Sequence, residues 1–245
     1  MATSAGVTWS YDLEGSVVSD DSPTLGQPVV PIYTARGFIP FSIEVGEDYP
    51  GFAQEMATLL SSGFEELVTE TLVTGSGSNE PTGLVTALLA NTNVQVNVTT
   101  NGLISATNVN VVFEKPRDRY RAKGTWLMSP GISDQVAGFA AGTGFNPSFF
   151  TVDLTGVVQS LRTRPVRTSV YMSDSTNVDA DVCVFGDFNQ YLYANRTGMN
   201  VELLPLVVDG SSGRPTGQRG WFAYARHGAA SINDEGFVLL KNKSS

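Results

Sequence analysis

The sequence predicts a mixed α+β protein with one long helix, an extended arm ahead of it and an α/β module behind it. Three observations support this fold class. Residues 50–72 repeat apolar side chains every three or four positions, as one face of an α-helix does. Residues 7–45 contain short alternating runs typical of strands, and residues 131–205 mix both patterns. We therefore expect the rest of the chain to be organised around the helix.

The first 45 residues are predicted to form a long β-hairpin arm. Apolar side chains alternate from Val7 to Tyr11 and again from Phe41 to Val45, and turn-forming residues lie between these runs. A two-stranded hairpin is only marginally stable in water. The arm is therefore expected to lie on other structure, either as an ordinary edge hairpin of its own domain or across a neighbouring subunit.

The long helix is expected to span about 22 residues and about 33 Å. Glu47 and Asp48 precede Pro50, and acidic residues followed by proline are typical of a helix N-terminus. The helix is predicted to end at Gly75, where a glycine-rich turn begins.

The remaining elements follow from local periodicity and turn residues. Helical segments are expected at 84–89, 104–113 and 132–139, and strands at 94–98, 149–154, 164–166 continuing after a turn at 169–172, 182–185 and 191–193. A turn is expected at 195–198, a loop at 209–220, and two final strands at 221–232 and 236–241.

Composition excludes several classes of protein. The 245 residues are 41% hydrophobic and 16% charged, as in a globular protein, and carry a net charge of −9. This charge argues against a protein that grips nucleic acid. Cys183 is the only cysteine, which excludes a disulfide framework. The N-terminus has no signal-peptide pattern and no stretch is long enough to span a bilayer, so a soluble protein is expected.

No residue is predicted to be catalytic, cofactor-binding or metal-binding, and the protein is not expected to be an enzyme. His227, the only histidine, follows Arg226 at an expected strand end, and a structural or surface role is favoured over catalysis. The segment 75–83 superficially resembles a phosphate-binding loop. It follows a helix, lacks the Gly-Lys-Ser/Thr ending, and carries Glu80, which would repel phosphate.

Adjacent carboxylates have an ordinary explanation. Glu65–Glu66 and Asp20–Asp21 are expected to be solvated. Asp179 and Asp181 could reach one cation, but the sequence indicates no third ligand.

Several motifs, in the same order along the chain, resemble tailed-bacteriophage major capsid proteins, whose fold is shared with encapsulins. The resemblance covers about residues 7–241. It rests on Trp-Ser-Tyr-Asp-Leu-Glu-Gly at 9–15, Glu-Asp-Tyr-Pro-Gly-Phe at 47–52, Gly-Ser-Gly-Ser-Asn-Glu-Pro-Thr-Gly at 75–83, the segment from Glu114 to Pro130, Arg-Pro-Val at 164–166 and Gly-Asp-Phe at 186–188.

The resemblance implies a division of the chain. Residues 1–45 would form the N-terminal segment and extended loop, and 46–130 a peripheral domain with a spine helix at 50–72. Residues 131–205 would form an α/β axial domain, and 206–245 strands that return to the peripheral domain.

It also implies a function, that of the major capsid protein of a tailed double-stranded DNA bacteriophage. Such a protein self-assembles into hexamers and pentamers of an icosahedral shell that encloses the genome. Its partners would be other copies, scaffolding, portal and decoration proteins, and packaged DNA bound without sequence specificity, with no membrane. It would be assembled in the host bacterial cytoplasm and located in the virion. An encapsulin-type nanocompartment shell is the alternative, and a monomeric sugar-binding or hydrolytic domain is a third reading from a different class.

The basic run from Lys115 to Lys123 holds five of the 15 basic residues. It is interpreted as a solvated helix end paired with Glu114 and Asp118, as an intersubunit patch, or as a genome contact. In the second reading its partners would be acidic residues such as Glu65, Glu66 and Glu70. The same alternatives apply to Arg162, Arg164 and Arg167.

Two departures from the family have consequences. Some members crosslink subunits through a lysine in the extended loop, but the first lysine here is Lys115, so a noncovalent shell is predicted. Family precursors usually carry a scaffolding segment ahead of the extended loop, which this sequence reaches within a dozen residues. A processed precursor, a separate scaffold and a partial chain are all compatible with this start.

Overall fold

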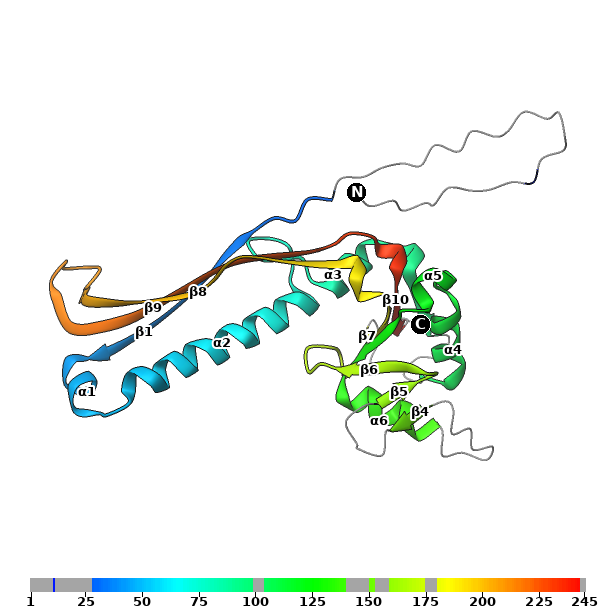
Figure 1. Cartoon of the computed structure of the whole chain (residues 1–245), viewed down its shortest axis with the longest axis horizontal. Helices are drawn as coiled ribbons and strands as arrows, with labels where there is room; N and C mark the ends of the chain where they lie inside the picture. Colours follow the sequence, from blue (N-terminus) through cyan, green and yellow to red (C-terminus); the bar gives the residue numbers. More distant parts are fainter. Residues whose placement is uncertain are drawn as a thin grey trace. The chain divides into compact units, whose positions relative to one another are not determined.

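The computed structural model describes Tyr11 and residues 28–98, 104–139, 150–152, 159–174 and 180–242 (Figure 1). The chain forms two compact units. We call residues 30–83 and 193–230 the helix unit, and residues 84–192 with 231–242 the sheet unit. These units do not divide the chain where the predicted domains do, because residues 84–130 belong to the same compact unit as residues 131–192. The assignment to peripheral and axial domains stays a prediction.

The helix unit combines a long helix with long strands. In Figure 1, β1, β9 and β8 run side by side in a three-stranded sheet of that order, in which β1 and β8 are the edges. Its elements are β1 (Tyr33–Ser42), α1 (Ile43–Asp48), α2 (Phe52–Thr74), β8 (Tyr191–Val208) and β9 (Pro215–Ser231), of which β8 and β9 extend by a residue or two into the sheet unit.

The second half of the predicted arm belongs to this sheet. β1 pairs antiparallel with β9 of the same chain, from Tyr33 opposite His227 to Ser42 opposite Gln218. The second half of the arm is therefore part of a larger sheet in its own unit, and the hairpin itself stays a prediction, because its first half, apart from Tyr11, lies outside the described residues. The predicted strand at 41–45 is wrong beyond Ser42, because the Ser42 hydroxyl accepts a hydrogen bond from the Val45 amide at 3.3 Å and caps α1.

The long helix is confirmed, with different bounds. α2 is 23 residues long and begins two residues after Pro50, with Gly51 at its N-cap at a φ of 89°. Asp48 ends α1, so the acidic pair does not cap α2 as predicted. The C-cap is Gly75, as expected.

Aromatic side chains fix the start of α2 to the sheet. The Phe41 ring lies 5.0 Å from the Phe52 ring and 6.3 Å from that of Trp221, measured between centroids. Glu47 of α1 pairs with Arg219 of β9 at 3.7 Å. These contacts explain why the chain reverses direction between β1 and α2 within a few residues.

β8 is longer than predicted. The expected turn at 195–198 is wrong, because the strand continues without interruption to Val208. The expected loop at 209–220 shrinks to the turn between Val208 and Pro215. Pairing with β9 therefore outweighs the turn preference of Asn195 and Gly198.

The sheet unit is a seven-stranded mixed sheet with helices, in the order β2-β10-β7-β3-β6-β5-β4. β10 pairs parallel with β2 and antiparallel with β7, and β3 pairs parallel with β6 and antiparallel with β7. The described elements are α3 (Leu84–Ala90), η1 (Thr92–Val94), β2 (Gln95–Val98), α4 (Ala106–Glu114), α5 (Asp118–Arg121), β3 (Thr125–Met128), α6 (Pro130–Gly138), β4 (Phe150–Val152), β5 (Gln159–Leu161), β6 (Arg164–Thr168), β7 (Asp181–Gly186), η3 (Phe188–Gln190), η4 (Asp234–Gly236) and β10 (Phe237–Asn242).

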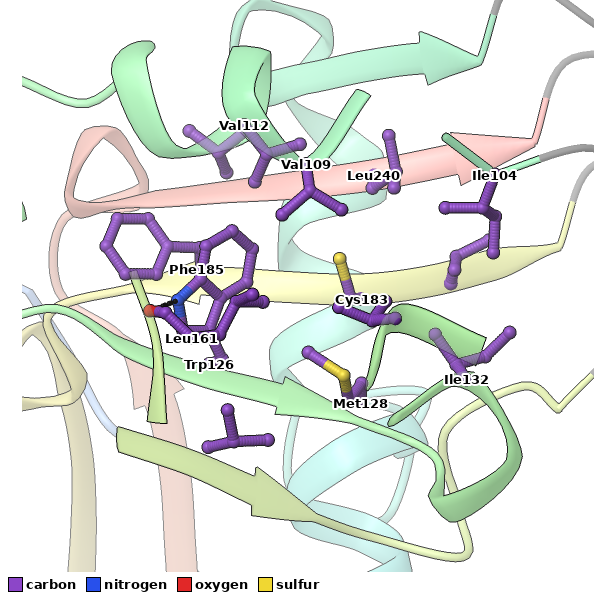
Figure 2. Packing of buried hydrophobic residues seen from close by; sticks show 14 of the residues in the cluster. Ile104, Val109, Val112, Trp126, Met128, Ile132, Leu161, Cys183, Phe185 and Leu240 are labelled. Atoms are coloured by element: carbon purple, nitrogen blue, oxygen red, sulfur yellow. Dashed lines mark hydrogen bonds between the residues drawn. The ribbon is translucent and has the colours of Figure 1, made fainter. Parts of the chain in front are cut away.

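The core of the sheet unit is built around Trp126 on β3 (Figure 2). Its ring lies 4.4 Å from that of Phe185 on β7, and its Nε1–H donates to the Leu161 carbonyl at 3.1 Å. Both aromatic side chains are fully buried. The indole therefore fills the core without leaving a buried donor unpaired.

The predicted helices and most predicted strands of this unit are confirmed within a few residues. The continuation at 169–172 is wrong, because Ser169–Met172 form a turn after β6. β5 had no predicted counterpart. Among the described residues, no helix has both the length and the apolar character needed to cross a bilayer.

Candidate assembly surface

α2 is only partly covered by its own unit. Of its 23 residues, Leu60, Thr71 and Val73 are buried. Leu59 and Leu67 are 55% and 42% exposed. A helix in a monomeric protein normally buries its apolar stripe, so these leucines indicate a surface that a partner covers.

A groove of about 250 Å³ lies beside these leucines, within the helix unit. Phe38 on β1, which is 46% exposed, belongs to its wall. The groove is open opposite Gly63, where an added Cβ would meet no atom within 4 Å. Its other lining residues come mainly from β1, β9 and α2, and include Gly37, Ile39, Leu60, Phe64, Ala223 and Ala225.

A second apolar surface lies on β8, at the edge of the three-stranded sheet. Its outer half exposes Val201, Leu203, Leu204, Leu206 and Val208. Edge strands of soluble monomers usually carry charged residues that discourage pairing with other chains, but Glu202 is the only charge in this stretch. These residues were not predicted to form a surface, although the apolar run from Val201 to Val208 was a usable signal in the sequence.

The turn between β8 and β9 is held by one carboxylate. The Asp209 side chain accepts hydrogen bonds from the Ser211 hydroxyl at 2.6 Å and from the Ser212 hydroxyl and amide at 2.7 and 3.0 Å. These hydrogen bonds lower the pKa of Asp209 to about 2. The turn is therefore a defined structure.

Five hydroxyl groups of α2 donate hydrogen bonds to the helix itself. Donors on Thr58, Thr69, Thr71 and Thr74 reach the carbonyl four residues earlier, at 2.7 to 3.1 Å. The Ser62 hydroxyl donates to the Leu59 carbonyl at 3.2 Å. These hydroxyls are already engaged on the helix surface.

The segment 75–83 is a closed loop. Glu80 Oε1 accepts from the Ser76 amide at 2.8 Å and from its hydroxyl at 2.7 Å, which lowers the pKa of Glu80. A Cβ on Gly75 would lie 2.3 Å from the Pro81 carbonyl oxygen, so glycine is required there. The loop's own carboxylate occupies donors that a phosphate would need.

His227 is buried in β9, four residues before the strand ends. Its ring lies 5.6 Å from that of Phe64 and 5.9 Å from that of Tyr193. Burial lowers its pKa, and neither ring nitrogen has a hydrogen-bond partner in the described part of the chain. No catalytic arrangement surrounds it among those residues.

The other candidate metal ligands do not come together in the described part of the chain. Cys183 is buried in the sheet-unit core, where burial raises the pKa of its thiol to about 12. Asp20, Asp21 and Asp179 lie outside the described residues. Within the ranges that the structure covers, no three His, Cys, Asp or Glu side chains lie together as a metal site.

Most of the basic run is engaged inside the sheet unit. Lys115 Nζ donates to the Gln95 carbonyl at 2.5 Å, Arg117 lies 3.8 Å from Glu235, and Arg121 pairs with Asp118. Burial lowers the pKa of Lys115.

Arg119 and Lys123 differ from the rest of the run. The Arg119 guanidinium lies over the Tyr120 ring at 4.6 Å, and neither it nor Lys123 has a carboxylate partner among the described residues. Of the two predicted partners, Glu114 and Asp118, only Asp118 forms an ion pair with the run among the described residues.

Arg162 and Arg164 also point to structure within the sheet unit. The Arg162 guanidinium donates to Asn110 Oδ1 and lies 4.7 Å above the Phe113 ring. Arg164 donates to the Ala122 carbonyl at 2.6 Å. Arg167 is exposed. Two of these three arginines are therefore held by their own unit.

Comparisons with known proteins agree with this picture. A model of the phage capsid family matches residues 2–242. The capsid of a native GTA particle is similar in structure, with a TM-score of 0.75, 20% identity, and coverage of 99% of this chain and 84% of that chain. No curated protein sequence matches.

Two further structures share the fold. One, from Mycobacterium phage Ogopogo, has a TM-score of 0.66, 14% identity, and coverage of 98% of this chain and 85% of that chain. The SrpI encapsulin complex from Synechococcus elongatus has a TM-score of 0.63, 13% identity, and coverage of 91% and 77%. The mixed α+β fold is thus one that capsids and an encapsulin share.

Proposed function

The chain belongs to the phage capsid family and is a capsid shell protein, and we propose that it is the major capsid protein of a tailed double-stranded DNA bacteriophage. In this proposal, copies assemble into hexamers and pentamers of an icosahedral shell that encloses the genome. The heterologous contacts between copies close into rings. The protein acts through its surfaces, as a structural component.

The observation that carries the proposal is the uncovered face of α2. Leu59 and Leu67 stay exposed beside an apolar groove, although the helix is twice the usual length. The apolar edge of β8 adds a second surface of the same kind. A monomeric binding domain or hydrolase would have no use for either, which argues against the reading from a different class.

In the assembled shell we assign residues 131–205 to the ring axes and α2 to the subunit edge, and we propose that the part of the arm ahead of β1 lies across a neighbour. Each copy then contacts several others, so modest contacts add up to a shell that resists internal pressure. The net charge of −9 would let packaged DNA move without adhering. Scaffolding, portal and decoration proteins would be further partners.

An encapsulin-type shell is the second candidate, because an encapsulin has the same fold at a TM-score of 0.63. The two functions differ in what the particle contains. A virus capsid holds nucleic acid, whereas the encapsulin reading requires a protein cargo on the inner face.

Electron microscopy of the purified full chain tests the proposal. We expect closed particles with icosahedral symmetry, in which pentamers and hexamers are resolved. Particles purified from an infected host should contain double-stranded DNA. Particles with protein cargo and no nucleic acid would favour the encapsulin reading, and a small monodisperse species at all concentrations would contradict both.

A further inference from the structure

We propose that Glu66 and Glu70 on α2 of one copy pair with Arg119 and Lys123 of a second copy. This contact rests on the proposed function, because it forms only when copies assemble. The two surfaces that meet in this contact are one face of α2 and the end of α5.

The acidic side of the contact is unusual for a single helix. Glu66 and Glu70 are both exposed and lie four residues apart, so they are neighbours on the helix and repel each other. α2 contains no lysine or arginine that could offset this repulsion. No ion pair joins either carboxylate to a residue that the structure describes.

The wider sequence around α2 has the same character. Residues 37–114 contain no lysine, arginine or histidine. Their acidic residues are Glu44, Glu47, Asp48, Glu55, Glu65, Glu66, Glu70, Glu80 and Glu114. A cation for α2 must therefore come from another part of the chain or from another molecule.

The basic side has a matching arrangement. Arg119 and Lys123 are exposed, and other basic residues around them already have partners. The Lys123 amide donates to the Tyr120 carbonyl at 3.1 Å, so the chain keeps turning past the end of α5. Two cations four residues apart thus face outward near one helical turn.

The two pairs match in sign, and the members of each pair are four residues apart in sequence. On α2 this spacing separates Glu66 and Glu70 by about 6 Å along the helix axis. Glu66 and Glu70 form a single row with Leu59, at offsets of seven and eleven residues, which places all three on one stripe of α2. The contact would therefore combine two ion pairs with burial of an exposed leucine.

A second copy satisfies both sets of charges, whereas nucleic acid satisfies one. Phosphates could pair with Arg119 and Lys123, but they would leave the two carboxylates without a partner and would repel them. In a shell of identical copies, both sets are present in equal number. Partner charges at an interface fix which surfaces meet and in which register.

A charge exchange between copies tests the proposal. The acid variant carries Glu66→Lys and Glu70→Lys, and the base variant carries Arg119→Glu and Lys123→Glu. We expect each alone to lower the yield of assembled particles by roughly 10-fold or more, because like charges then meet at the contact. An equimolar mixture of the two should restore even-numbered rings such as hexamers, in which the variants can alternate, and a chain with all four changes should form complete shells.

Matched controls separate the contact from general charge effects. Glu65→Lys changes a neighbouring exposed residue that lies about 100° around the helix, and it should assemble like the wild type. Arg167→Glu is the corresponding control on the sheet unit. Glu66→Gln with Glu70→Gln should reduce the salt sensitivity of assembly, which keeps the test valid if the reversed variants fail to fold.

Four outcomes would overturn the proposal. Rescue by the four changes in one chain, with no hexamers from the mixture, would place the contact within a single copy. Base-variant particles that assemble normally but lose their nucleic acid would assign the cations to the genome. Wild-type yields from all variants would leave both surfaces free. Failure of the wild type itself to form particles would overturn the proposed function, and this contact with it.

Discussion

At the scale of single residues, His227 lowers the free energy of unfolding of the helix unit. Its imidazole is buried between two aromatic rings, and both nitrogens lack partners among the described residues. A buried polar group without a hydrogen bond destabilises a fold by about 1–3 kcal/mol. Protonation would add the larger cost of a buried charge, and for this reason the pKa of His227 lies below its ordinary value.

We predict that His227→Phe stabilises the unassembled protein and that the gain grows as the pH falls from 7.5 to 5.5. Below about pH 6.5 the unfolded chain binds a proton at His227 more readily than the folded chain does. The free energy of unfolding of the wild type therefore decreases as the pH decreases through this window. Phenylalanine retains the ring and removes the titration. Thermal unfolding midpoints at several pH values provide the measurement.

The other titratable groups are common to both proteins, so their contributions cancel in this comparison. A gain that is constant between pH 7.5 and 5.5 would show that His227 does not titrate differently in the two states.

The role of a single residue could be predicted from sequence when its interaction partner was close to it in sequence. The contact of Glu80 is of this local kind, because its partner Ser76 is only four residues away. The roles of Arg162 and Arg164 were not predictable, because Asn110 and Ala122 are 52 and 42 residues distant in sequence. Only the fold brings these partners together.

At the scale of single elements, β9 packs closely against the chain just before β1, and this close packing depends on Gly228. A Cβ at this position would lie 2.0 Å from the Pro31 carbonyl oxygen, far inside contact distance. Gly198 lies in β8 of the same sheet, where an added Cβ would meet nothing within 4 Å. The two glycines form a matched pair.

We predict that Gly228→Ala destabilises the protein by about 1–3 kcal/mol, because backbone must move to accommodate the methyl group. Gly198→Ala should be neutral or slightly stabilising, because it only restricts the unfolded chain. Urea unfolding of both variants measures the difference. Equal effects would show that Pro31 does not pack against β9 as described.

Element boundaries were predictable where the signal was local. α2 ends at Gly75 as expected, and Ser42 was an available cap signal for α1 that the alternation of apolar residues concealed. The continuation of β8 through Asn195 and Gly198 was not predictable, because long-range pairing with β9 determines it. The groove beside α2 also needed the structure, since it depends on how β1 and β9 lie against the helix.

At the scale of the whole molecule, sequence order carried more information than any single pattern. The motifs between residues 9 and 188 were individually weak, but together they indicated the family that the match to residues 2–242 identifies. The compact units were not predictable in this way, because the chain passes between them more than once.

We predict that the assembled shell is noncovalent. The arm contains no lysine, since the first one in the chain is Lys115, so it offers no amine for an isopeptide bond. Particles boiled in detergent should run on a denaturing gel as one band near 26.1 kDa. A ladder at multiples of this mass would contradict the prediction.

The internally bonded hydroxyls of α2 have a consequence for a newly made copy. Four threonine hydroxyls and one serine hydroxyl donate to the helix's own carbonyls. The exposed surface of α2 therefore consists mainly of methyl groups and carboxylates. Such a surface carries no cation for a phosphate group and repels it through its carboxylates. We therefore expect nucleic acid not to bind along this helix, whichever other surfaces of the subunit it meets.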